Sequence, residues 1–147
     1  SGNLEIGGSM LSDTAEYALR ATLYIAQHAN GSRLVRTDEA AEALGVPRNY
    51  LSKILHVLAR HGVLSSTRGP LGGFRLAHAA DDLPLYRILE PFDPIGPQRR
   101  CILGRPECHD GNPCPAHRRW KGISEKVLSF FRETTVGDLL REEGSLV

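Results

Sequence analysis

Small and apolar residues recur at helical spacing near the start of the chain, at Ala15, Ala18, Leu19, Thr22, Ile25 and Ala26. This spacing predicts a helix with one buried face. Ser12 or Asp13 is suited to cap its start, and Asn30-Gly31 is suited to end it. A second stripe on the same helix consists of Tyr17, Ala21 and Tyr24. We expect this stripe to face another helix or another subunit.

Two further helices are predicted on either side of a Gly45-Val46-Pro47 break. Thr37 can cap the first, which has an apolar side made of Ala40, Ala41 and Leu44. The second is expected over residues 48–61, because proline is favoured at a helix start. Its core stripe, at i, i+3, i+4 and i+7, is Leu51, Ile54, Leu55 and Leu58. Polar and basic residues occupy the opposite face.

A helix, a short turn with glycine and a helix with a polar outer face form the helix-turn-helix pattern. Two ordinary helices joined by a turn would give the same pattern. The residues that follow favour the DNA-binding interpretation, because 63–67 and 74–76 read as two short strands around the turn Arg68-Gly69-Pro70-Leu71-Gly72-Gly73. A β-hairpin at this place is a wing, so the chain is predicted to begin with a winged helix-turn-helix.

The second half is predicted to be helical around an irregular loop. Asp81-Asp82-Leu83-Pro84 should open a short helix, and Thr134 or Thr135 should cap a last one that ends near Leu140. Between them, a long helix should run from Pro115 to about Glu133. Its apolar seam is Trp120, Ile123, Val127 and Phe130. The seam favours a dimerisation helix, although the helix would show the same seam if it folded back on its own core.

The predicted fold class is therefore mostly α with a small β-hairpin wing, a winged helix-turn-helix followed by a long dimerisation helix. Residues 1–9 are expected to be an expression scar ahead of Met10. Residues 10–80 are predicted to form the DNA-binding domain, and residues 81–147 to hold the cysteine loop and the dimerisation helices.

Charge is distributed unevenly along the 147 residues, although the net charge is only +1. Between Arg33 and His78 there are seven basic and three acidic residues, as in a module that contacts phosphates. No run of about 18 apolar residues is present, so we expect no membrane span. The sequence has no phosphate-binding loop, nucleophile elbow or HExxH motif, so we expect no enzyme.

All three cysteines of the chain lie in one loop rich in glycine and proline, CILGRPECHDGNPCPAH. Cys101, Cys108 and Cys114 are followed by His117 in the spacing Cys-x6-Cys-x5-Cys-x2-His. Three thiolates and an imidazole indicate a soft-metal or iron–sulfur site. Structural zinc and a thiol redox switch remain open alternatives. An odd number of cysteines and no sign of secretion favour a reducing cytoplasm.

The candidate DNA contacts lie at the start of the third predicted helix and in the wing. Arg48, Asn49, Ser52 and Lys53 are placed to face base edges or phosphates in the major groove. Arg68 lies in the wing turn, where an arginine can enter a narrow minor groove. Each of these residues is equally suited to be a solvated surface side chain.

Four stretches resemble a known family. They are DTAEYALRATLYIA, VPRNYLSKILHVLARHGVLSSTRGPLGGFRLA, the cysteine loop, and SFFRETTVGDLL. Together they resemble the iron–sulfur winged-helix transcription regulators of the Rrf2 type, which include IscR-, NsrR- and RirA-like proteins. The resemblance covers nearly all of residues 10–140.

The resemblance implies a homodimeric DNA-binding regulator, expected to be a repressor of a pseudo-palindromic operator. It implies a redox, nitric oxide or iron–sulfur sensor with a cluster on Cys101, Cys108 and Cys114. In IscR-like members a histidine at the position of His117 completes the site. In NsrR-like members an acidic residue in the first helix of the partner subunit does so, which corresponds to Glu16 here. Histidine ligation is typical of a two-iron cluster and acidic ligation of a four-iron cluster, so both remain open.

Overall fold

The computed structural model describes residues 11–93 and 101–146, and its centre is helix α1 (Asp13–His28). The side chain of Ser12 caps α1 by accepting a hydrogen bond from the backbone N–H of Ala15 at 3.1 Å, which confirms one of the two predicted caps. The buried face of α1 consists of Ala15, Ala18, Ala21, Thr22, Leu23 and Ile25. Helices α2 (Thr37–Leu44), α3 (Arg48–Arg60), α4 (Leu85–Leu89) and α6 (Val136–Leu140) and strand β2 (Gly73–Leu76) pack around α1, so this helix lies at the centre of the core.

The second stripe of α1 faces helices of the same chain. The Tyr24 hydroxyl donates a hydrogen bond to Glu39 of α2 (Thr37–Leu44) at 3.0 Å. Tyr17 meets Tyr50 of α3 (Arg48–Arg60) edge to face, with 5.8 Å between ring centroids. The predicted alternative, contact with another subunit, is therefore not needed to explain this stripe.

Helices α2 and α3 follow the predicted pattern with one correction. All four predicted core residues of α3, Leu51, Ile54, Leu55 and Leu58, are buried. Gly45 separates the helices at φ +67°, a left-handed conformation that favours glycine. Thr37, however, is the first residue of α2 and not its cap. Arg36 takes the cap position and its side chain donates to the wing instead.

The wing is an antiparallel hairpin of β1 (Leu64–Thr67) and β2 (Gly73–Leu76), with Leu64 opposite Leu76. Two backbone hydrogen bonds between Val35 and Phe74, at 3.0 and 2.7 Å, add the segment before α2 to this hairpin. Phe74 is buried in the core, so the base of the wing is fixed to the head.

The predicted helix that should open at Asp81 is divided in two. A 3₁₀ turn, η1 (Ala80–Asp82), is followed by α4 (Leu85–Leu89), and Pro84 stands at the cap of α4. The extended backbone of Leu83 and Pro84 pairs with the chain before α6 (Val136–Leu140): Leu85 N–H donates to Thr134, and Val136 N–H donates to Leu83, each at 2.9 Å. The C-terminal helix thus returns to the head.

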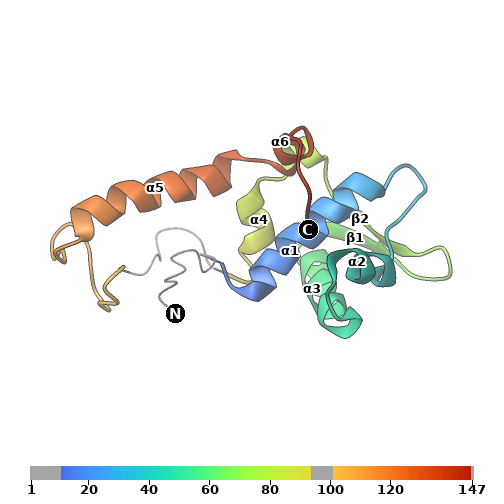
Figure 1. Ribbon diagram of the computed structural model, residues 1–147, viewed down its shortest axis with the longest axis horizontal. Helices are drawn as coiled ribbons and strands as arrows, with labels where there is room; N and C mark the ends of the chain where they lie inside the picture. The colour runs from blue at the N-terminus through green and yellow to red at the C-terminus, as the bar shows by residue number, and fades with distance from the viewer. Residues whose placement is uncertain (1–10, 94–100, 147) are drawn as a thin grey trace, which may run out of the picture.

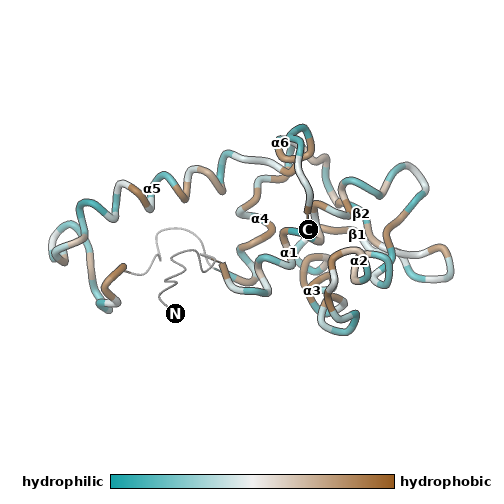
Figure 2. The backbone as a smooth tube through the Cα atoms, in the orientation of Figure 1, coloured by the Kyte–Doolittle hydropathy of each residue, from teal (hydrophilic) through white to brown (hydrophobic). Residues whose placement is uncertain are grey.

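Helix α5 (His117–Glu133) projects away from the head, and the cysteine loop lies at its far end (Figure 1). Apolar and polar residues alternate along it (Figure 2). Phe131 is buried near the end that joins the head, whereas Ile123 is 56% and Phe130 50% exposed. The helix therefore packs on the chain's own core only where it joins the head. Of its predicted seam, Ile123 and Phe130 are exposed and Trp120 and Val127 are half-buried.

Candidate metal centre and nucleic-acid interface

The structure brings the three cysteines together. The Sγ atoms of Cys101, Cys108 and Cys114 all lie within 4.8 Å of one another. The Sγ atoms of Cys101 and Cys114 are 3.5 Å apart. Cys114 is buried, and the other two are half-buried. The three sulfur atoms therefore form one group in the structure, and their role as metal ligands stays a prediction.

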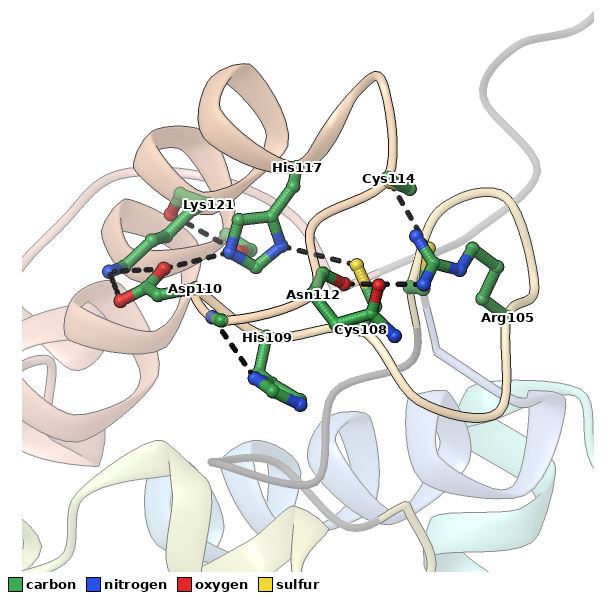
Figure 3. A network of polar contacts seen from close by, with 11 residues as sticks. Arg105, Cys108, His109, Asp110, Asn112, Cys114, His117 and Lys121 are labelled. Carbon is green, nitrogen blue, oxygen red and sulfur yellow. Dashed lines mark hydrogen bonds and ion pairs between the residues drawn. The ribbon is translucent and has the colours of Figure 1, made fainter.

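His117, the first residue of α5, joins this group through Cys108. Its Nδ1 atom lies 3.2 Å from Cys108 Sγ, and its Nε2 atom lies 2.9 Å from an Asp110 carboxylate oxygen. Lys121, one helical turn further along, contacts both oxygens of the same carboxylate, at 3.2 and 2.9 Å. Figure 3 shows the imidazole between the sulfur on one side and the carboxylate on the other.

The surroundings of the site shift the pKa values of two of its cysteines in opposite directions. The backbone N–H of Arg105 donates to Cys101 and, despite opposing desolvation, the pKa of this thiol is lowered to about 7; the Leu103 N–H and the neighbouring thiols also lower it. For Cys108, the backbone N–H of Cys114 acts to lower the pKa, but burial and the neighbouring sulfur atoms outweigh it and the net pKa is raised. Hydrogen bonds from Lys121 and His117 lower the pKa of Asp110.

The start of α5 carries positively charged side chains. Its first turn carries no acidic residue, although helix N-termini favour acids, and it contains Arg118 and Arg119. Thiolates are stabilised near a helix N-terminus and near cations. The donor set of three thiols and one imidazole therefore fits a metal ion or an iron–sulfur cluster.

The two predicted fourth ligands are placed differently. His117 lies beside Cys108, as its spacing predicts. Glu16 is half-buried in the first turn of α1, and neither it nor His117 belongs to the group whose ligand atoms all lie within 4.8 Å of one another. The role predicted for Glu16 is to act from a partner subunit, so it stays a prediction.

The predicted DNA contacts lie on the face formed by α3 and the wing. A groove of about 270 Å³ lies between α2, α3 and the hairpin, and its walls include Arg36, Asp38, Arg48, His56 and Arg68. Arg48 and Arg68 are thus brought to one groove. Asn49 and Lys53 are exposed and Ser52 half-buried on α3, and none of the three belongs to the groove walls.

Two residues of this face escaped the sequence analysis. Arg36 donates to the Pro70 carbonyl at 2.7 Å and so holds the wing turn. Asp38 forms an ion pair with Arg48. Neither contact could be predicted from residue spacing, because Arg36 meets a backbone carbonyl of the wing and Asp38 meets a side chain of α3 only once these elements are packed.

Comparison with known proteins matches residues 11–142 to the family Rrf2, described as "Iron-dependent Transcriptional regulator". A protein named as a putative HTH-type transcriptional regulator in Aquifex aeolicus is 37% identical over 136 residues, which are 91% of this chain and 93% of that protein. The HTH-type transcriptional regulator IscR of Vibrio atlanticus is 30% identical over 132 residues, 90% of this chain and 75% of that protein.

Solved structures show the same fold. The global cysteine regulator CymR of B. subtilis superposes with a TM-score of 0.74 at 22% identity, covering 89% of this chain and 95% of that one. IscR of T. potens gives a TM-score of 0.70 at 23% identity, covering 91% and 88%. Both likenesses confirm the predicted helical fold with its small wing.

Within the described residues, no helix has the length and apolar character needed to cross a membrane.

Proposed function

The chain belongs to the Rrf2 family of transcriptional regulators, and on that premise we propose that it is a homodimeric repressor that senses redox state, nitric oxide or iron–sulfur supply through a cluster on its cysteines. It is a DNA-binding regulator and not an enzyme. We place it in the cytoplasm, where its DNA target lies and where thiols stay reduced.

The observation that carries the cluster proposal is the donor set at the far end of α5. Three sulfur atoms within 4.8 Å of one another and an imidazole nitrogen 3.2 Å from one of them offer three soft thiolate ligands and one imidazole. The relatives named IscR support the same assignment. Cys101, Cys108, Cys114 and His117 would hold the group, with Glu16 of a partner subunit as the alternative fourth ligand. Histidine favours a two-iron cluster, and glutamate a four-iron cluster.

When bound, the cluster would supply a centre that reacts with oxidants and nitric oxide. The residues around the cysteines would then couple the state of the cluster to the conformation of the start of α5. Cys114 is buried three residues before the first residue of α5, and its carbonyl accepts the His117 N–H at 3.0 Å, so the loop is hydrogen-bonded to the start of the helix. A change in what the sulfur atoms bind would therefore alter the conformation of the first turn of α5.

For DNA recognition we propose that Arg48, Asn49, Ser52 and Lys53 face the major groove and that Arg68 enters the minor groove. Arg48 and Arg68 border one groove of the surface, which supports a common target. One winged helix has a small interface with DNA, so high affinity favours two heads on a pseudo-palindromic operator.

The second head would come from dimerisation through α5. Its exposed apolar residues support this, and so does Trp120, whose indole N–H is buried without a hydrogen-bond partner among the described residues. A buried donor of this kind normally has a partner. The division into a DNA-binding domain, residues 10–80, and a cluster and dimer region, residues 81–147, stays part of this proposal.

The test is anaerobic purification followed by a visible absorption spectrum and by iron and acid-labile sulfide analysis. We expect a coloured protein with iron and sulfide, and loss of both in Cys114→Ser. His117→Ala and Glu16→Gln, measured separately, identify the fourth ligand. A colourless protein with one bound zinc and no sulfide would refute the cluster and leave a zinc-stabilised regulator.

A thiol switch is the second candidate, favoured by the 3.5 Å between Cys101 Sγ and Cys114 Sγ. A disulfide needs about 2.05 Å, a small movement within a loop. One protein of similar fold, CymR of Staphylococcus aureus, has a crystal structure of its oxidized form. Non-reducing mass spectrometry of peroxide-treated, metal-free protein should then show a Cys101–Cys114 peptide pair and altered DNA binding. No disulfide under these conditions would rule this candidate out.

A further inference from the structure

Asp110 supplies the carboxylate that contacts the imidazole of His117 within the part of the chain that the structure describes. It approaches Nε2 at 2.9 Å, on the side of the ring away from the cysteines. The opposite ring nitrogen, Nδ1, faces Cys108 Sγ at 3.2 Å. The two ring nitrogens are therefore assigned to different partners.

The chemistry of the carboxylate decides which nitrogen carries the proton. An ionised carboxylate only accepts hydrogen bonds, so the contact requires an N–H at Nε2. In the neutral ring this leaves a lone pair on Nδ1. The lone pair points to the side where the sulfur atoms gather, which is the orientation that a metal ligand needs.

Lys121 keeps the carboxylate in place. Its Nζ contacts both carboxylate oxygens, at 3.2 and 2.9 Å, and it lies four residues after His117 on the same helix. The Asp110 side chain is 73% exposed, whereas that of His117 is 18% exposed. Exposed ion pairs add little to folding stability. The contacts of Asp110 with Lys121 and His117 therefore affect the orientation of the imidazole more than the stability of the fold.

We propose that Asp110, held by Lys121, is a positioning residue that fixes His117 in the Nε2–H tautomer and presents Nδ1 to the metal or cluster. Ligating histidines commonly donate their other N–H to a carboxylate in this way. The inference rests on the proposed function, because it gives His117 the role of ligand. The inference goes beyond the proposed function because it states that the His117 imidazole is already oriented before any metal binds.

The first test uses the full-length, reduced, metal-free protein. Long-range ¹H–¹⁵N NMR of labelled histidines, at a pH where the rings are neutral, reports the tautomer of His117. We expect the Nε2–H form in the native protein, its loss in Asp110→Ala, and its retention in Glu125→Ala, which removes an equal charge from the exposed face of α5. The Nδ1–H form in the native protein, or no change in Asp110→Ala, would overturn the inference.

The second test is anaerobic titration of the same proteins with Co²⁺, whose visible bands report sulfur and nitrogen ligation. Loss of an outer carboxylate commonly weakens metal affinity about 10- to 100-fold, so Asp110→Ala should bind Co²⁺ more weakly by that factor. Lys121→Gln should lie between it and the native protein. Equal affinities in all variants would contradict the positioning role.

The two proposals can fail separately. If the tautomer depends on Asp110 while anaerobic protein contains no iron or sulfide, the positioning role stands and the cluster does not. If iron and sulfide are present but the tautomer ignores Asp110, the cluster stands and the positioning role does not.

Discussion

Arg48 and Arg68 carry the same charge but are held differently. Arg48 is paired with Asp38 of α2, so in the proposed DNA complex it would exchange this carboxylate for a phosphate or a base. Arg68 lies in a turn that Arg36 fixes from outside by its bond to Pro70. The sequence could predict both as DNA contacts from their place in the motif. It could not predict Asp38 or Arg36, whose roles depend on packing between distant segments.

The Arg68 side chain gives the clearest single-residue prediction. Arg68→Ala should weaken operator binding about 10- to 100-fold, because a charge-assisted contact contributes roughly 1.5–3 kcal/mol. The slope of log K against log salt should also decrease in magnitude by about 0.9, the effect of one lost phosphate neutralisation. Fluorescence anisotropy at several salt concentrations measures both.

Leu71 provides the control for this prediction, since it lies in the same turn and is 91% exposed. Leu71→Ala removes no charge and should leave the salt slope unchanged. An unchanged slope for Arg68→Ala as well would mean that Arg68 does not neutralise a DNA charge.

At the scale of elements, hydrophobic periodicity correctly predicted which elements form and which of their faces are buried. The α3 stripe and the paired strands of the wing follow directly from residue spacing, and all four α3 positions are buried. The predicted boundaries differ from the structure at elements whose ends make hydrogen bonds to other segments. Thr37 lost the cap position of α2 to Arg36, and the helix expected at Asp81 is interrupted by backbone pairing with residues before α6.

The wing turn depends on Gly72. A Cβ atom at this position would lie 2.1 Å from the Thr67 carbonyl oxygen, a backbone atom that cannot move without opening the hairpin. Because a single winged helix relies on its hairpin for part of a small DNA interface, Gly72→Ala should reduce DNA affinity at least about tenfold. The helical core should keep its fold, as circular dichroism would show.

The matched control for the wing is Gly122→Ala in α5, where an added Cβ meets nothing within 4 Å. There the change should stabilise the protein by about 0.5–1 kcal/mol, because alanine favours helix. Full DNA affinity in Gly72→Ala would show that the hairpin tolerates distortion.

Between the two predicted caps of the last helix, the structure selects Thr135. Its side chain accepts from the Asp138 N–H at 3.0 Å, and Asp138 accepts from the Thr135 N–H at 2.9 Å, which completes a capping box. Thr135→Ala should lower the free energy of unfolding by about 1 kcal/mol. Urea denaturation measures this, with Thr134→Ala as the control. Equal losses in both variants would mean that the box contributes nothing specific.

At the scale of the whole molecule, α5 joins the cysteine loop to the head. Within the head, the Ser12 N–H at the start of α1 donates to Asp93 at 2.7 Å. Thr14 in turn contacts the Tyr50 hydroxyl on α3 at 2.5 Å. These two contacts tie the start of α1 to Asp93 and to α3. They could not be predicted from the sequence, because polar contacts between separate segments leave no periodic pattern.

The exposed seam of α5 leads to the last prediction, which concerns assembly. A single chain leaves Ile123 56% and Phe130 50% exposed, and Ile102 and Leu103 in the cysteine loop are 53% and 59% exposed. Burying such residues in a second copy stabilises a dimer by about 25 cal/mol per Å² of apolar surface, before the costs of association. Ile123→Glu with Phe130→Glu should therefore give a monomer by light scattering, whereas Lys126→Glu, at an exposed position of the same helix, should not.

The monomer also separates assembly from DNA recognition. Its affinity for a single half-site should equal that of the native protein, because the head is unchanged. Its affinity for the full pseudo-palindrome should fall by about 10²- to 10⁴-fold, the usual gain from linking two binding modules. A double variant that stays dimeric would place the interface elsewhere, and equal binding to the full operator by a monomer would show that one head suffices. A monomer that keeps its affinity for the half-site and loses affinity for the full operator would instead make α5 the element that sets the distance between two heads. The cysteine centre lies at the end of α5 away from the head.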